Sequence, residues 1–155
     1  MTILETPPQT PIRALVLLAV ASFATQASGR VTDSLLPQIA ADFNVTVGAA
    51  AVVVTAYAVM HGSVQLIIGP IGDKFGKYRT ITFAVAAAAV MVMLCGLAHS
   101  LNMLALARLA SGAFAGWVIP LGMAYLGDVT PYEKRQQVLG TYLSGQITGQ
   151  LFGQA

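Results

Sequence analysis

Four stretches of at least 19 residues carry no charged side chain, and they restrict the possible folds more than any other feature. They cover residues 43–72, 80–107, 109–127 and 136–155. About 20 apolar residues in a helix cross the ~30 Å hydrocarbon core of a bilayer. Only 9% of the chain is charged, against about a quarter in a soluble domain. The sequence therefore predicts an all-α membrane protein, a multi-span helical bundle. It excludes intrinsic disorder, nucleic-acid binding and a soluble enzyme fold.

The charged clusters divide the chain into a tail and a transmembrane domain. Residues 1–13 are expected to form a cytoplasmic N-terminal tail, and residues 14–155 a partial N-terminal transmembrane domain. The expected spans cover residues 14–36, 47–68, 80–98 and 103–126, with an incomplete fifth from about 138. The segments 37–46, 69–79, 99–102 and 127–136 are expected to be loops. The apolar pattern stops at Ala155 without a basic flank, which indicates a piece of a longer protein.

The start of the chain also allows another interpretation. Arg13 and the apolar residues up to Ala21 resemble a secretory signal peptide with its cleavage site. The apolar pattern continues past Ala21, and further spans follow it. A first transmembrane span therefore explains this segment better than a cleaved signal peptide does.

The positive charges indicate which side of the membrane each segment faces. The tail and the segments 69–79 and 127–136 together carry six lysine and arginine residues. The opposite segments, 37–46 and 99–102, carry none. Because lysine and arginine accumulate in cytoplasmic loops, the N-terminus is expected in the cytoplasm. The multi-pass protein is expected in the plasma (cytoplasmic) membrane.

The segment between the second and third expected spans has a specific pattern of glycine, acid and base. It reads Gly-Pro-Ile-Gly-Asp-Lys-Phe-Gly-Lys-Tyr-Arg over residues 69–79. This resembles the signature loop of the major facilitator superfamily, G-x-x-x-D-[RK]-x-G-[RK]-[RK], placed between the same two spans. The matching positions are Gly69, Asp73, Lys74, Gly76 and Lys77. Tyr78 stands where a basic residue is usual. A glycine at position 76 also permits a turn that a β-carbon would obstruct.

Other segments resemble the same superfamily. Residues 32–43 look like the stretch that ends the first span, particularly among drug and metabolite efflux members, and residues 108–120 resemble its R-x-x-x-G motif. The resemblance implies the N-terminal portion of an alternating-access transporter, whose signature loop latches two halves together. The implied partners are the lipid bilayer, a small-molecule substrate, protons and the missing C-terminal half. In the fifth span, residues 149–154 lack the proline and final glycine usual in efflux antiporters. The resemblance therefore supports transport better than it supports antiport.

Three charged residues lie inside the expected spans, where a charge at the membrane centre costs about 2.5–3.5 kcal/mol. Arg30 and Asp33 are three residues apart and share a helix face. Arg108 is expected at the same depth on the antiparallel fourth span, so a cross-helix pair with Asp33 is possible. We hypothesise that Asp33 is the coupling carboxylate and that Arg30 and Arg108 are its electrostatic partners. The alternatives are a static ion pair and a hydrated Asp33 near the interface.

Small and polar residues in the spans allow structural and functional interpretations. Glycines at every fourth position favour close helix packing; they are Gly112, Gly116, Gly145, Gly149 and Gly153. The uncharged polar residues in the spans are Gln26, His61, Gln65, Gln146 and Gln150. Gln26 and Gln146 could line a substrate cavity or bridge helices. His61 could titrate near neutrality or act only as a hydrogen-bonding residue.

No pattern typical of covalent catalysis, of a cofactor or of a metal site occurs in the sequence. A lone cysteine, Cys95, provides neither an internal disulfide nor a metal site. The expected function is secondary active transport of small solutes, as proton-coupled efflux, and not enzymatic catalysis. The alternatives are a small non-transport membrane protein, an inactive transporter fragment and a small oligomeric multidrug pump. The loop at residues 69–79 favours a transporter over the small non-transport protein and the small multidrug pump, because neither of these requires it.

Overall fold

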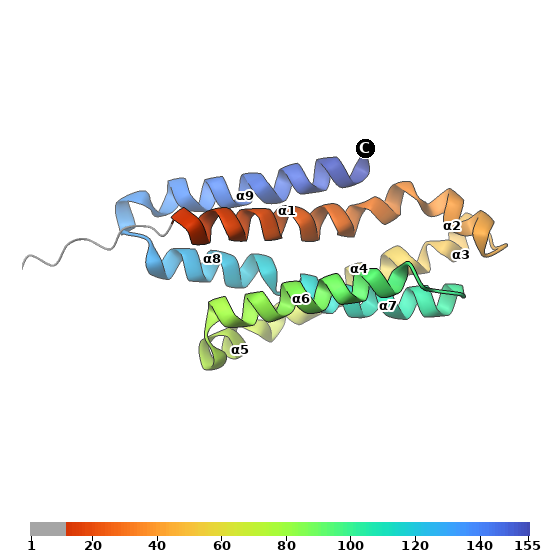
Figure 1. Cartoon of the computed structure of the whole chain (residues 1–155), viewed down its shortest axis with the longest axis horizontal. Helices are drawn as coiled ribbons and strands as arrows, with labels where there is room; N and C mark the ends of the chain where they lie inside the picture. The colour runs from red at the N-terminus through yellow and green to blue at the C-terminus, as the bar shows by residue number, and fades with distance from the viewer. Residues whose placement is uncertain (1–11) are drawn as a thin grey trace, which may run out of the picture.

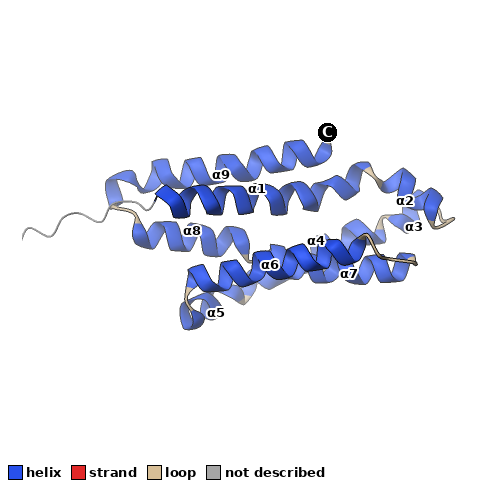
Figure 2. Cartoon of the chain, in the orientation of Figure 1, coloured by secondary structure: helices blue, strands red, loops and turns tan. Residues whose placement is uncertain are grey.

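A computed structural model describes residues 12–155, and this part of the chain is helical apart from short connections (Figures 1 and 2). In chain order its elements are α1 (Ile12–Ser34), α2 (Leu36–Asp42), α3 (Val47–Ala50), α4 (Val52–Ser63), η1 (Val64–Leu66), α5 (Ile68–Phe75), α6 (Lys77–Cys95), α7 (Leu101–Ala115), α8 (Val118–Val129) and α9 (Tyr132–Gln154). The all-α prediction is therefore confirmed. The expected tail lies outside the described residues except for positions 12 and 13, which begin α1.

Four segments of the described chain are long and apolar enough to cross a membrane. They are α1, α6, the segment Val47–Leu66 and the segment Leu101–Val129. The last two consist of α3, α4 and η1, and of α7 and α8. α9 has 23 residues, which is enough to cross a bilayer, but its sequence is too polar to be counted with the four.

The helices form two groups that lie along each other (Figure 1). In one group α9 runs beside α1 over most of its length. In the other, α7 packs against both α4 and α6. α8 lies next to α6 and α1 and so connects the groups. The buried core between them is apolar and contains Leu18, Ile81, Leu121 and Tyr142, and Tyr142 donates a hydrogen bond to the Val118 carbonyl at 2.9 Å.

α9 approaches α1 through a row of glycines. A β-carbon at Gly145 would lie 2.9 Å from the Ala19 carbonyl oxygen, and one at Gly149 or Gly153 would meet the carbonyl oxygen of Phe23 or Ala27. Backbone therefore contacts backbone at three successive turns. Glycine lets transmembrane helices come this close, and dispersion contacts between them then replace contacts with lipid.

α7 approaches α4 in the same way. A β-carbon at Gly112 would meet the Tyr57 carbonyl oxygen, and one at Gly116 would lie 2.6 Å from the His61 carbonyl oxygen. The two glycines are four residues apart, so they face α4 on successive turns. All five glycines considered for helix packing thus lie against the backbone of a neighbouring helix.

Three of the expected loops contain helix instead. α2 fills most of segment 37–46, and α9 starts at Tyr132, inside segment 127–136. Within segment 69–79, only Gly76 separates α5 from α6. Its φ of +87° is a conformation that glycine adopts without strain, so one residue is enough to reverse the chain. A cluster of charges predicts where a membrane boundary lies, but it does not predict where a helix ends, because a helix can continue into water.

The fourth span is interrupted, which the sequence analysis did not predict. α7 ends at Ala115, and α8 begins at Val118. Pro120 follows the interruption; a proline has no N–H group, and its ring clashes with the carbonyl four residues earlier, here that of Gly116. Pro70 stands in the same relation to Leu66, where the second span ends in the 3₁₀ turn η1.

Basic segments gather at one end of the bundle. The start of α1, the turn between α5 and α6 and the connection from α8 to α9 share that end (Figure 1). The α2–α3 connection and the α6–α7 turn lie at the opposite end. The outer surface between the two ends is apolar, with side chains such as Leu66, Met93 and Phe152 at least 70% exposed. A belt of this kind suits contact with lipid.

Candidate transport cavity

A polar cavity of about 380 Å³ lies between α1, α4, α8 and α9. Its wall consists of Gln26, Gly29, Arg30, Asp33, Val54, Tyr57, Ala58, His61, Gly62, Gln65, Ile119, Gln146 and Gln150. The set includes the four glutamines and the histidine that were singled out in the sequence, Gln26, His61, Gln65, Gln146 and Gln150. They come from segments up to 124 positions apart, yet they line one space. The glycine contacts described above hold α9 and α1 together along one side of it.

Arg30 and Asp33 form an ion pair on the α1 wall of this cavity. The Arg30 guanidinium Nη1 lies 3.3 Å from the Asp33 carboxylate Oδ2, and the two residues are one helical turn apart. Their side chains are 47% and 30% exposed. The Asp33 carboxylate is thus open to the cavity while the neighbouring guanidinium balances its charge. This arrangement allows the carboxylate to meet water, a solute or a proton.

Arg108 does not pair with Asp33 in the described chain, contrary to the cross-helix pair considered from the sequence. Its guanidinium instead donates hydrogen bonds to two α1 carbonyl oxygens, of Ser28 at 3.1 Å and of Gly29 at 2.8 Å. The residue is only 3% exposed. The planar guanidinium presents several N–H donors in a fixed fork, which matches two successive carbonyls better than a carboxylate farther along α1. Arg108 therefore ties α7 to α1.

Tyr57 is a cavity residue that the sequence analysis missed. The Arg108 guanidinium lies over its ring, 4.3 Å from the centroid, and the His61 ring stacks on it at 5.4 Å and 26°. The spacing of four between Tyr57 and His61 was the available signal, because it places two rings on one helix face. Tyr57 Oη and His61 Nδ1 are buried without a hydrogen-bond partner among residues 12–155.

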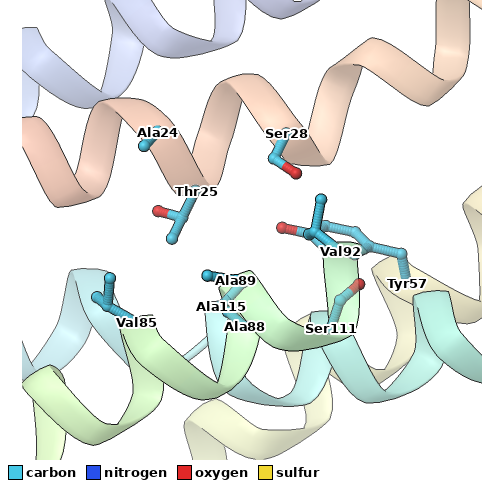
Figure 3. Close-up of a pocket in the computed structure, with 10 residues that line it drawn as sticks. All are labelled: Ala24, Thr25, Ser28, Tyr57, Val85, Ala88, Ala89, Val92, Ser111 and Ala115. Atoms are coloured by element: carbon cyan, nitrogen blue, oxygen red, sulfur yellow. The ribbon is translucent and has the colours of Figure 1, made fainter. Parts of the chain in front are cut away.

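A second, apolar cavity of about 250 Å³ adjoins the first (Figure 3). Small residues form much of its wall, including Ala24, Ala88 and Ala115, and Tyr57 lines both cavities. In Figure 3 the Tyr57 hydroxyl points into this apolar space, on the side of Ser28. A side chain at Gly29 would collide with the Tyr57 hydroxyl, whose oxygen would lie 2.8 Å from the added β-carbon. The Tyr57 ring is therefore a shared wall between a polar and an apolar space.

The residues of the signature-like loop surround another space, at the basic end of the bundle. Lys77 Nζ lies 2.7 Å from the Asp128 carboxylate and 3.0 Å from that of Asp73. It thereby connects the start of α6 with the ends of α5 and α8. These residues line a cavity of about 570 Å³ together with Gly76. Lys74 does not belong to this group; its ammonium lies 5.4 Å from the Phe75 ring centroid. Gly69 has open space where a β-carbon would stand.

The match to a known family covers nearly the whole described chain. A model of the Major Facilitator Superfamily matches residues 18–155. The chain belongs to this superfamily. The loop pattern at residues 69–79 and the four apolar spans agree with this membership.

Three similar proteins illustrate the relationship. The chain is 28% identical to the MFS-type transporter YwfA of Bacillus subtilis, over 92% of this chain and 35% of that protein. It is 30% identical to the multidrug export protein EmrB of Haemophilus influenzae, over 88% of this chain and 27% of that protein. It is 33% identical to the lincomycin resistance protein of Streptomyces lincolnensis, over 89% of this chain and 31% of that protein. The chain thus spans about a third of the length of these relatives.

Proposed function

We propose that this chain is the N-terminal part of a secondary transporter that exports small solutes across the plasma membrane in exchange for protons. The observation that carries the proposal is the polar cavity, in which an ion pair and four glutamines face one space between membrane-spanning helices. Ionisable side chains at membrane depth are costly and are kept mainly where they serve transport. Relatives named for multidrug export and lincomycin resistance support the direction of efflux.

Alternating access would use two halves that rock around the cavity. The chain covers about a third of its relatives, and a second half would supply the facing wall. With the basic end of the bundle in the cytoplasm, where lysine and arginine accumulate, the N-terminus is cytoplasmic as well. Lys77 and the two carboxylates it binds stand at that end, in a position to contact the second half.

Asp33 is the proposed coupling residue. Its carboxylate lies on the cavity wall, partly exposed and paired with Arg30. Arginine stays protonated, so Arg30 can balance the charge of Asp33 whenever no proton is bound. Each proton that crosses with the membrane potential supplies about 2.3 kcal/mol per 100 mV. In this coupling Arg108 has a positioning role, because its hydrogen bonds to Ser28 and Gly29 hold the stretch of α1 next to Arg30.

The test uses the complete protein encoded by the gene, reconstituted in vesicles with a pH gradient. Asp33→Asn is expected to abolish proton-driven solute movement, while exchange of solute across the membrane without a gradient continues. Asp42→Asn is the matched control, because Asp42 ends α2 and does not line the polar cavity. Proton-driven movement that survives Asp33→Asn unchanged would refute the assignment. Residues 1–155 alone are expected to show no flux above that of empty vesicles.

A further inference from the structure

We infer that the polar cavity takes uncharged or anionic organic solutes that carry hydrogen-bond acceptors beside a flat ring, and that it rejects lipophilic cations. The inference rests on the proposed transport function and adds the class of substrate. Three features of the wall support it: its charge balance, its carboxamides and its ring pair.

The charge balance of the cavity is unfavourable to cations. Asp33 contributes the carboxylate among the described lining residues, and that carboxylate is engaged by Arg30. The other titratable groups facing the space are His61 and Tyr57, and neither is an anion at neutral pH. Arg108 adds a positive charge directly behind the Tyr57 ring. The lining charges of Arg30 and Asp33 therefore cancel, so a cation would find no free carboxylate on the wall, while the positive charge of Arg108 beyond the Tyr57 ring opposes it.

The carboxamides provide uncharged recognition from three different elements. Gln26 lies on α1, Gln65 in η1, and Gln146 and Gln150 on α9. Each carboxamide carries one C=O acceptor and two N–H donors, and one donor of Gln65 is already used in a hydrogen bond to the His61 carbonyl at 3.3 Å. Such groups can exchange hydrogen bonds with carbonyl, hydroxyl or carboxylate groups of a solute. They do so without the cost of removing water from another ion.

The ring pair offers a flat surface that is already occupied by a cation. Tyr57 and His61 are stacked at 5.4 Å, and the Arg108 guanidinium lies 4.3 Å from the Tyr57 centroid. The attraction of the Tyr57 ring for positive charge is thus used within the protein. A planar solute would stack on the His61 ring, which also lines the cavity. In addition, a polar solute or water in the polar cavity can satisfy His61 Nδ1, which has no partner among residues 12–155.

The experiment compares three probes in vesicles that contain the complete protein. They are chloramphenicol, which is uncharged, fluorescein, which is an anion at neutral pH, and ethidium, which is a cation. Chloramphenicol and fluorescein are expected to move at least about tenfold faster than ethidium, because tenfold corresponds to only about 1.4 kcal/mol. Ethidium movement at the rate of the other two would overturn the inference and leave the proposed transport function intact.

An added carboxylate should remove the selectivity. Gln146→Glu places a carboxylate in the cavity and is expected to raise ethidium movement about tenfold relative to chloramphenicol. Gln26→Glu provides the same change from α1, in case the first variant folds poorly. Gln136→Glu is the matched control on α9, because Gln136 is exposed and does not line the cavity. Equal selectivity in all variants would contradict the inference. Absence of any probe or proton movement would refute the transport function itself, and this inference with it.

Discussion

Replacing Gly149 by alanine tests whether direct backbone contact holds α9 against α1. A β-carbon at this position would meet the Phe23 carbonyl oxygen and would lie 2.9 Å from the Phe23 Cα. Both are main-chain atoms, so neither can turn away as a flexible side chain would. Gly140 is the matched control, because it lies on the same helix and its β-carbon would have nothing within 4 Å.

The two substitutions share one effect and differ in another. Alanine is a better helix former than glycine by about 1 kcal/mol, and this gain applies at both positions. Overpacking at Gly149 costs about 1–3 kcal/mol. Gly140→Ala is therefore expected to raise the free energy of unfolding by about 1 kcal/mol. Gly149→Ala is expected to be about 1–3 kcal/mol less stable than Gly140→Ala.

The measurement is unfolding of the complete protein by sodium dodecyl sulfate in mixed micelles, followed by circular dichroism. A Gly149→Ala protein as stable as Gly140→Ala would refute the argument, because it would show that α9 can move away from α1 at no cost. A difference within the stated range would support backbone contact along this interface. The same stability difference should appear without any added solute.

Three further predictions concern other contacts. Arg108→Met removes two hydrogen bonds to α1, including the one to Gly29, and is expected to destabilise the complete protein by about 1–3 kcal/mol. Thermal unfolding measures this loss. An unchanged unfolding midpoint would contradict the role given to Arg108. Lys77→Met removes an exposed ion pair with Asp128, so a smaller fall in the unfolding midpoint is expected, and it should disappear in about 1 M salt. A fall that does not depend on salt would argue for a buried contact. Gly76→Ala forces a residue with a side chain to adopt a φ of +87° and is expected to lower the free energy of unfolding by about 1–2 kcal/mol. Chemical unfolding measures this change. An unchanged free energy of unfolding would mean that the turn adapts to the alanine.

The fold class and the family could be predicted from the sequence because both depend on local information. Apolar runs of about 20 residues have few alternatives to membrane-spanning helices. The loop pattern from Gly69 to Arg79 needs no tertiary knowledge to be seen. Helix ends could not be predicted as well, because charge at the boundary shows where the membrane stops and not where a helix stops. Segment 69–79 illustrates this, since a single residue in it, Gly76, is non-helical.

The partner of Arg108 depended on tertiary structure, whereas the pairing of Arg30 with Asp33 did not. Arg30 and Asp33 are neighbours on one helix, so their pairing followed from spacing alone. The partner of Arg108 lies on another helix, and from the sequence the Asp33 carboxylate was the candidate. The structure gives it two α1 carbonyls instead, because the rotation of α7 about its own axis decides which atoms its side chain can reach. The residue pattern of a single segment does not predict how its helix is rotated relative to a neighbouring helix.

By itself, the sequence determined that this protein is a bundle of membrane-spanning helices, and it determined how its basic residues divide between the two ends of the bundle. Those properties follow from the free energy of transferring each residue between water and lipid, which does not depend on the residues that it contacts in the fold. Only the tertiary structure decided that Gln26, His61, Gln65, Gln146 and Gln150 share one cavity, with Tyr57 as the wall toward an apolar space. Such an enclosure depends on how closely the glycines let the helices approach, and that distance is a property of pairs of helices.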